Sequence, residues 1–208
     1  MYLFSDNHIL LGDKPSGLCT QDGFDEMAKN WIKEHYNKPG SVFLEPIHRL
    51  DKPVSGLVLF ARTSKALSRL QEQMRDRQIR KTYIALVEGN PPAKQAFLEH
   101  FLTHESYHAR LADPSDPKAK RAYLHYHVIE RKENLSLVEI ELFTGRYHQI
   151  RAQFSLIGCP VLGDRKYGSK LSFSGTGIAL HHSRLIFTHP VTKEEKEFHS
   201  PVPLSWNS

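Results

Sequence analysis

The chain has 208 residues, enough for one domain with a sizeable hydrophobic core. Its 28 lysines and arginines outnumber its 23 aspartates and glutamates, and this mild basic excess suits a polyanionic partner. The sequence has no apolar run of about 18 residues, so no transmembrane helix is predicted. The amino terminus lacks a signal-peptide pattern. The two cysteines have neither metal-site nor disulfide-framework spacing. We therefore expect a cytoplasmic protein without a membrane partner.

The first half of the chain predicts two strands and two helices. A strand over residues 9–11 runs into a turn, and the uninterrupted apolar run 57–61 is typical of a buried strand. The apolar spacing predicts a helix over residues 24–36 and a second one from Ser64, its expected cap, to about residue 78. The expected inward-facing side chains are Phe24, Met27, Ala28 and Trp31 in the first helix and Leu67, Leu70 and Met74 in the second.

The second half predicts more strand than helix. Residues 83–87 form a further apolar run, and residues 121–131 and 135–143 alternate as the two strands of a hairpin. Residues 148–158 fit a helix that ends at Gly158. Its expected apolar stripe is Ile150, Phe154 and Ile157, and its expected polar face is His148, Arg151 and Ser155. Because no repeat or linker interrupts the chain, we expect a single domain over residues 1–208.

Two segments are candidates for chemistry. The segment HRLDKPVSG, residues 48–56, displays the carboxylate of Asp51 on a loop directly before a buried strand. Such loops commonly carry reactive groups, although an aspartate there also forms Asx turns with its own backbone. The segment TGRYHQIR, residues 144–151, places a flexible glycine before a helix start, where N–H groups could cradle a phosphate. An ordinary solvent-facing helix is the alternative for this segment.

Together these segments resemble the RluA-type RNA pseudouridine synthases. The family pattern is HRLD, two variable residues, Thr or Ser, then SG, followed by a TGR-x-HQ block and a GDxxYG block, which reads GDRKYG at residues 163–168 here. Further matching blocks are KPSG at 14–17, RKTYIALVEG at 80–89 and LHHSRLIFTHP at 180–190. The blocks keep the family's order over nearly the whole chain. One departure is Val54, which follows Pro53 and replaces the usual threonine, so a loop hydroxyl is lost.

The resemblance implies an α+β fold with a mixed, mostly antiparallel sheet, flanking helices and a central RNA-binding cleft. It implies an isomerase that converts uridine to pseudouridine in ribosomal or transfer RNA, without a cofactor or metal because the reaction is an internal rearrangement. Asp51 is the implied catalytic carboxylate, and Arg151 is the cation that keeps it ionised and oriented. Tyr83 would stack on the uracil, unless it is simply a core aromatic. Arg146 is the less favoured partner of Asp51.

The expected RNA-binding side chains are Arg49, Arg146, His148, Arg80 and Lys81. Arg49 could fill the gap that a flipped base leaves in its stack, or contact a phosphate. The basic cluster at residues 75–81 is either a solvated helix end or an RNA-backbone contact. Because the chain begins almost at its first motif block, we expect no separate amino-terminal RNA-binding module. No obligatory protein partner is evident from the sequence.

Two other classes of function compete with this interpretation. An RNA-binding or ribosome-assembly factor could keep the fold without catalysis, but Asp51, Tyr83 and Arg151 are all present. A carboxylate hydrolase of nucleosides or glycosides usually needs two catalytic carboxylates, and the HRLDKPVSG, TGRYHQIR and GDRKYG blocks supply only Asp164 besides Asp51. The three histidines between residues 100 and 108 have helical metal-site spacing, but they run into a proline-rich loop, so no metal site is expected.

Overall fold

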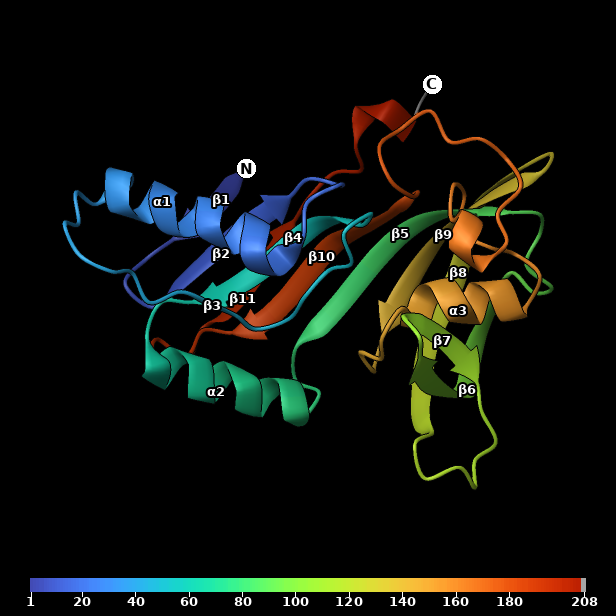
Figure 1. Ribbon diagram of the computed structural model, residues 1–208, viewed down its shortest axis with the longest axis horizontal. Helices are drawn as coiled ribbons and strands as arrows, with labels where there is room; N and C mark the ends of the chain where they lie inside the picture. The colour runs from blue at the N-terminus through green and yellow to red at the C-terminus, as the bar shows by residue number, and fades with distance from the viewer. Residues whose placement is uncertain (207–208) are drawn as a thin grey trace. The chain divides into compact units, whose positions relative to one another are not determined.

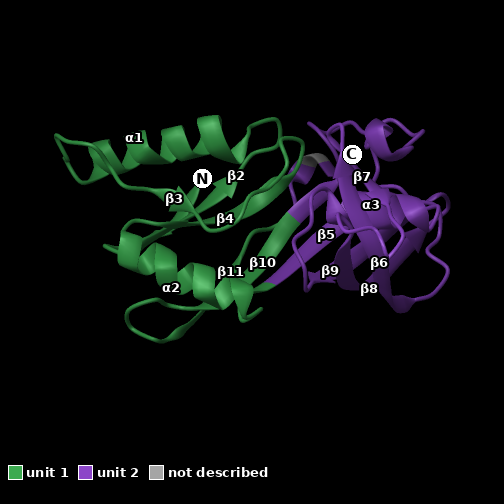
Figure 2. Ribbon diagram, turned by 60° about the horizontal axis from the view of Figure 1, so that its bottom comes forward, with its two compact units in different colours: residues 1–80, 182–201 green, residues 81–181, 202–208 purple. Residues whose placement is uncertain are grey.

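The computed structural model describes residues 1–206, and Figure 1 shows its helices and strands. The chain divides into two compact units, coloured separately in Figure 2: residues 1–80 with 182–201 form unit 1, and residues 81–181 with the segment from Val202 form unit 2. Each unit has a mostly antiparallel sheet and few helices, which confirms the expected α+β class. Among the described residues no helix has the length and apolarity needed to cross a membrane. The single domain stays a prediction.

Unit 1 is a sheet that carries two helices. Its strands follow the order β1, β2, β4, β10, with β3 beside β4 and β11 beside β10. The strands are β1 Tyr2–Ser5, β2 Ile9–Lys14, β3 Glu45–Pro46, β4 Ser55–Ala61, β10 Leu180–Thr188 and β11 Glu195–His199. The helices are α1 Asp25–His35, preceded by the irregular turn η1 Thr20–Phe24, and α2 Ser64–Arg75. The first two residues of β10 belong to unit 2.

Strand β4 is buried throughout because the two helices cover its opposite faces. Leu57 and Leu59 pack in one core cluster with Leu70 of α2. Phe60 points to the other face and packs against Phe24, the residue directly before α1, with ring centroids 5.8 Å apart. All seven residues of β4 are buried, as the apolar run predicted. A strand that is buried on both faces has a continuous run of apolar residues in its sequence, rather than an alternation of apolar and polar ones.

Both helices of unit 1 lie where the sequence predicts them, with three differences. The cap of α2 is Thr63 and not Ser64, because the Thr63 hydroxyl accepts a hydrogen bond from the Ala66 amide at 3.1 Å. The helix ends at Arg75, before the expected residue 78, and Arg77 then adopts a left-handed backbone with φ 58°. Met27 is 42% exposed, since the buried apolar side chains are Phe24, directly before α1, and Ala28 and Ile32 within it.

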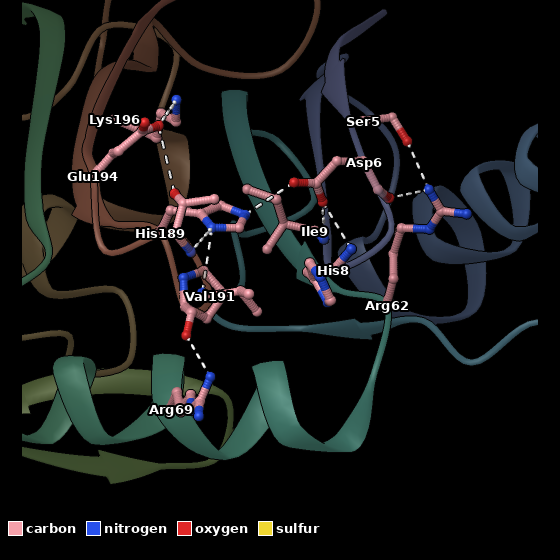
Figure 3. Close-up of polar contacts among 12 residues, drawn as sticks. Ser5, Asp6, His8, Ile9, Arg62, Arg69, His189, Val191, Glu194 and Lys196 are labelled. Carbon is pink, nitrogen blue, oxygen red and sulfur yellow. Dashed lines mark hydrogen bonds and ion pairs between the residues drawn. The ribbon is translucent and has the colours of Figure 1, made fainter.

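A polar clasp joins three distant segments of unit 1 (Figure 3). The Asp6 carboxylate accepts hydrogen bonds from the backbone of His8 and Ile9, and its second oxygen lies 2.9 Å from Nε2 of His189. The other ring nitrogen of His189 accepts from backbone amides that follow it, so Nε2 carries the proton and donates to Asp6. Arg62 donates to the Asp6 carbonyl and to Ser5. The clasp holds the β1–β2 turn against the end of β10.

Gly56 is required where β4 passes the backbone of β10. Its φ is +115°, and a Cβ atom at this position would lie 2.4 Å from the carbonyl oxygen of His182. Both the backbone conformation and the close approach exclude a side chain.

We therefore predict that Gly56→Ala lowers the free energy of unfolding by about 3 kcal/mol. Gly40→Ala is the matched control, because no atom lies within 4 Å of the added methyl group. Chemical denaturation of both variants checks this prediction. Equal stability of the two variants would show that β10 can move away from β4 at little cost.

Unit 2 is a five-stranded antiparallel sheet with α3 over one face (Figure 1). The strand order is β5, β9, β8, β6, β7. The elements are β5 Arg80–Glu88, β6 Gln95–Glu105, β7 His108–Leu111, β8 Lys120–Lys132, β9 Leu135–Leu142, α3 Gln149–Leu156 and the short helices η2 Arg165–Tyr167 and η3 Leu204–Trp206. The predicted hairpin is confirmed as β8–β9, and the predicted strand 83–87 is part of β5.

Helix α3 begins one residue later than predicted and buries a side chain that the sequence placed on a polar face. His148 precedes the helix in a left-handed conformation with φ 49°. Arg151, expected on an outward-facing polar face, is only 5% exposed. Ile150 and Phe154 are buried as predicted, whereas Ile157 lies after the helix and is half-buried. A buried guanidinium requires a partner, and that partner defines the site in unit 2.

Candidate active site

The hydroxyl group of Thr20 fixes the loop of unit 1 that carries Asp51. Thr20 Oγ1 accepts a hydrogen bond from the Leu50 amide and donates one to the Leu50 carbonyl, both at 3.0 Å. The Val54 amide closes the loop by donating to the Asp51 carbonyl at 3.0 Å. Asp51 itself is half-buried. The residue before the carboxylate is therefore fixed at both of its backbone groups, and this limits the directions in which Asp51 can point.

The KPSG block supports the other side of the same loop. Lys14 is fully buried, and its ammonium group donates to the carbonyls of Pro15, Leu18 and Lys52 at 3.0, 2.7 and 3.5 Å. Burial lowers the pKa of Lys14 to about 8, although electrostatic interactions with Cys19 and Asp51 act to raise it. Two blocks that are far apart in the sequence thus form one substructure.

The change from threonine to Val54 is accommodated by apolar packing and by a hydroxyl from another segment. Val54 is 3% exposed, so its side chain belongs to the core. Ser16 Oγ donates to the carbonyl of Pro53 at 2.8 Å. The loop is therefore tethered by the segment 16–20 at both ends, although it lacks the hydroxyl at position 54.

We predict that Thr20→Val lowers the free energy of unfolding by about 1–3 kcal/mol, because both backbone groups of Leu50 lose their buried partner. The change also speeds hydrogen exchange of the Leu50 amide. Thr20→Ser keeps the hydroxyl and is expected to behave like wild type. Exchange measured by NMR on the three proteins checks the prediction, and wild-type protection in Thr20→Val would contradict it.

Two of the expected RNA-binding arginines are exposed in unit 1. Arg49 donates to the side-chain oxygen of Gln21 at 2.8 Å. Arg80 forms an ion pair with Glu195 at 3.0 Å in which both side chains are more than half exposed. Exposed pairs of this kind contribute little to stability, so both arginines can exchange their present partner for an anion.

The partner of Arg151 within unit 2 is Asp164. The guanidinium Nε and Nη2 donate to the two carboxylate oxygens at 2.6 and 2.9 Å, and the side chains are 5% and 1% exposed. This is the bidentate geometry that makes arginine–carboxylate pairs strong and directional. The GDRKYG block, which contributes Asp164, therefore fixes the orientation of the arginine in the TGRYHQIR block. From the sequence, Asp164 is only a second carboxylate within the motif blocks, and no role is predicted for it.

Tyr167 of the same block joins this network. Its ring lies 4.9 Å below the Arg151 guanidinium. Its hydroxyl accepts a hydrogen bond from the Ala109 amide at 2.8 Å and lies within hydrogen-bond distance, 2.9 Å, of Nδ1 of His148. Burial, followed by the positive charges of Arg151 and Lys166, lowers the pKa of His148 to about 3. His148 is therefore neutral at physiological pH and contributes a hydrogen-bonding ring rather than a positive charge.

Strand β5 presents Lys81 and Tyr83 on one face, together with the buried Ala85 and Val87. Tyr83 is 6% and Lys81 is 7% exposed. Burial lowers the pKa of Lys81 to about 8. Its ammonium lies 3.8 Å from the position that a Cβ of Gly145 would occupy. Within residues 1–206 no carboxylate pairs with this buried amine, which makes it a candidate for binding an anionic ligand.

The turn before α3 uses its own polar groups to close on itself. The Gln149 side-chain oxygen accepts from the Arg146 amide at 3.0 Å and from the Thr144 hydroxyl at 2.7 Å. The exposed Arg146 side chain donates through Nε to the carbonyl of Arg121 at 2.9 Å. One amide expected to cradle a phosphate is thus engaged within the turn, whereas the neighbouring charges of Arg146 and Lys81 can still attract one.

The site residues divide between the two units. Unit 1 holds Asp51, Arg49 and Arg80, and unit 2 holds Lys81, Tyr83, Arg146, His148 and Arg151. Within unit 2 His148 and Arg151 belong to one network. Sequence reasoning missed the supporting roles of Thr20 and Asp164, whose only signal was their position in or near the motif blocks. The predicted approach of Asp51 to Arg151 and Tyr83 stays a prediction.

The histidines between residues 100 and 108 lie on strands β6 and β7 and not on a helix, so their spacing loses its meaning as a metal-ligand pattern. Gln153 lies 3.0 Å from Nδ1 of His100, and His104 stacks on Tyr147. In residues 1–206 no three His, Cys, Asp or Glu side chains are grouped to hold a metal ion.

Comparison with known proteins gives a consistent result. Residues 8–156 match the family model described as RNA pseudouridylate synthase. An uncharacterised RNA pseudouridine synthase of Bacillus subtilis is 35% identical over 97% of this chain and 68% of its own length. The ribosomal large subunit pseudouridine synthase D of Zymomonas mobilis is 33% identical over the same shares. The structure of human RNA pseudouridylate synthase domain containing 4 superposes with a TM-score of 0.85 at 23% identity, covering 99% of this chain and 90% of the human one, which supports the same fold.

Proposed function

This chain belongs to the RNA pseudouridylate synthase family and is an isomerase that converts uridine in RNA to pseudouridine, and we propose that Asp51 is its catalytic carboxylate and ribosomal RNA its substrate. The ribosomal assignment is supported by relatives that are named for the ribosomal large subunit, such as the Zymomonas mobilis synthase. Transfer RNA is the alternative substrate. The enzyme would act in the cytoplasm without an obligatory protein partner.

The reaction needs one ionised carboxylate and no redox partner. The bond between N1 of uracil and C1′ of ribose breaks, the base turns, and a bond forms between C5 and C1′. The proton leaves C5 and the base regains one at N1, so atoms and electrons balance within the substrate. A carboxylate can act as nucleophile at the ribose or the base, or as a proton acceptor. Asp51 suits these roles because its loop is held at Leu50, Lys52 and Pro53.

The observation that carries the proposal is the buried pair between Arg151 and Asp164. Arginine has five N–H donors, and Asp164 engages two of them. A guanidinium fixed in this way can present its remaining edge to a second carboxylate, and we assign that carboxylate to Asp51. The arginine would then hold the pKa of the Asp51 carboxyl down and orient it. Tyr83 is proposed to stack on the target uracil, and Arg49, Arg80, Arg146 and His148 to contact the RNA.

We predict that purified protein forms pseudouridine in total cellular RNA in the presence of EDTA and without added nucleotide. Asp51→Asn, which keeps the size of the side chain and removes its charge, should abolish formation and leave RNA affinity within a few-fold of wild type. Liquid chromatography of digested RNA and filter binding check the two arms. Substantial turnover by Asp51→Asn would remove Asp51 from its catalytic role.

Lys81 is proposed to bind a phosphate of the RNA near Gly145. Its ammonium is buried, lacks a carboxylate partner among the described residues, and shares a strand face with Tyr83. Because a buried cation is costly without an anion, a phosphodiester from the substrate would complete the pair.

We predict that Lys81→Met weakens RNA binding and lowers the slope of log Kd against log salt by about one. Because burial lowers the pKa of Lys81 to about 8, the amine is charged below pH 8 and neutral above it. RNA affinity of the wild type should therefore fall between pH 7 and pH 9, and this fall should be smaller in Lys81→Met. The exposed Lys132→Met serves as the control. An unchanged salt slope in Lys81→Met would contradict the assignment.

A further inference from the structure

Tyr167 is buried at the point where three elements of unit 2 meet. It belongs to a core cluster with Ala109 of β7 and Ala152 of α3, and only 6% of the residue is exposed. Its amide donates to the carbonyl of Asp164 at 2.9 Å, and its carbonyl accepts from the Ser155 hydroxyl of α3 at 2.7 Å. The backbone of Tyr167 is therefore held on both sides, and this gives its ring a defined place.

The ring of Tyr167 restrains the Arg151 guanidinium in a direction that Asp164 restrains only weakly. The N–H groups of a guanidinium lie in its plane, so the two hydrogen bonds to Asp164 fix its edge. They resist tilting of the plane much less. The centre of the guanidinium lies 4.9 Å from the centroid of the Tyr167 ring, within the range in which an aromatic face attracts a cation. The ring thus opposes the tilt that the carboxylate allows.

The short helix η2 explains why both supports of Arg151 come from one block of the sequence. Asp164 directly precedes η2, and Tyr167 is its last residue. In a 3-10 helix, side chains three positions apart lie on the same side, and the hydrogen bond from the Tyr167 amide to the Asp164 carbonyl has this spacing. The carboxylate and the ring are therefore presented together to the same arginine.

The hydroxyl of Tyr167 has a different role, at the edge of the sheet. Among the described strands β7 pairs only with β6. Alternate amides of such an edge strand have no partner within the sheet, and the Ala109 amide donates to the Tyr167 hydroxyl at 2.8 Å. Ala109 is only 4% exposed, so this hydrogen bond satisfies a buried donor. The hydroxyl thus closes the sheet edge, while the ring faces Arg151.

We propose that Tyr167 is a positioning residue for the reaction, whose ring holds the plane of the Arg151 guanidinium in the orientation that meets the catalytic carboxylate. This inference rests on the proposed function, in which Arg151 is the partner of Asp51. Asp164 sets the edge of the guanidinium, and Tyr167 sets its tilt. The alternative is a purely structural role in the core and at the sheet edge.

The two roles use different atoms of the side chain, so two variants separate them. Tyr167→Phe removes the hydroxyl and keeps the ring, whereas Tyr167→Leu removes the ring as well. Tyr167→Met, which fills the space without an aromatic face, replaces the leucine variant if that variant does not fold. Tyr126→Leu is the matched control, because Tyr126 is fully buried in the same unit and packs against Phe154 of α3, with ring centroids 5.6 Å apart.

The first measurement follows the arginine itself and does not require activity. NMR relaxation gives the order parameter of the Arg151 Nε–H group, whose signal is assigned by its absence in Arg151→Met. We expect a value near that of rigid backbone, about 0.85, in the wild type, Tyr167→Phe and Tyr126→Leu. In Tyr167→Leu we expect a value in the flexible range, below about 0.6. An unchanged order parameter in Tyr167→Leu would overturn the inference.

The second measurement is the single-turnover rate of pseudouridine formation. We expect Tyr167→Leu to be about 10-fold slower, the factor that a desolvated cation–π contact contributes to an equilibrium. Its RNA affinity should stay within a few-fold of wild type, because Tyr167 is buried. Tyr167→Phe and Tyr126→Leu should keep nearly the wild-type rate.

Equal losses of rate in Tyr167→Leu and Tyr126→Leu would indicate a structural role and overturn the inference. A wild-type rate in Tyr167→Leu, despite a lower order parameter, would overturn the role of Tyr167 in the reaction. If the wild type forms no pseudouridine, the proposed function fails, whereas the order parameter still tests the contact between Tyr167 and Arg151. The two failures are therefore distinguishable.

Discussion

The buried ion pair between Arg151 and Asp164 is the interaction on which the candidate site depends. The free energy needed to remove two charged groups from water can exceed the free energy gained from their attraction. A buried ion pair is therefore favourable only with good geometry and further hydrogen bonds. The geometry here is good, because the pair is bidentate, and the ring of Tyr167 packs against the guanidinium. The pair ties α3 to the loop after it. Removing either partner would leave an uncompensated buried charge, and the orientation of Arg151 would be lost.

In unit 1 the residues around Asp51 are likewise held in place by hydrogen bonds, here from a neutral and a cationic donor. The Thr20 hydroxyl holds Leu50, and the Lys14 ammonium holds the carbonyl of Lys52, so the residues on both sides of Asp51 are fixed. Each unit therefore presents one charged side chain of the proposed chemistry on a preorganised support. Preorganisation of this kind matters because a misplacement of about 1 Å can cost roughly 100-fold in rate.

Local sequence patterns were sufficient for most elements of the fold. The apolar run of β4 and the alternation of the β8–β9 hairpin predicted both correctly, because each pattern reports directly on burial. The supports of the site could not be predicted in this way. Thr20 lies 30 residues from Leu50, and Asp164 lies 13 residues from Arg151 beyond the end of its helix, so no periodicity connects them. Helical spacing also predicted, wrongly, that Arg151 lies on an outward face. Spacing within a helix does not show that a buried carboxylate, that of Asp164, pairs with the arginine.

The central claim, that Asp164 orients Arg151 for catalysis, is tested most directly by a double-mutant cycle. Single-turnover rates of pseudouridine formation are measured for Asp164→Asn, Arg151→Met and the double variant, with RNA affinity and thermal stability recorded in parallel. We expect Asp164→Asn to lose about 100-fold in rate with RNA affinity within a few-fold of wild type, and the double variant to be no slower than Arg151→Met alone. A wild-type rate in Asp164→Asn, or losses that multiply in the double variant, would contradict the account.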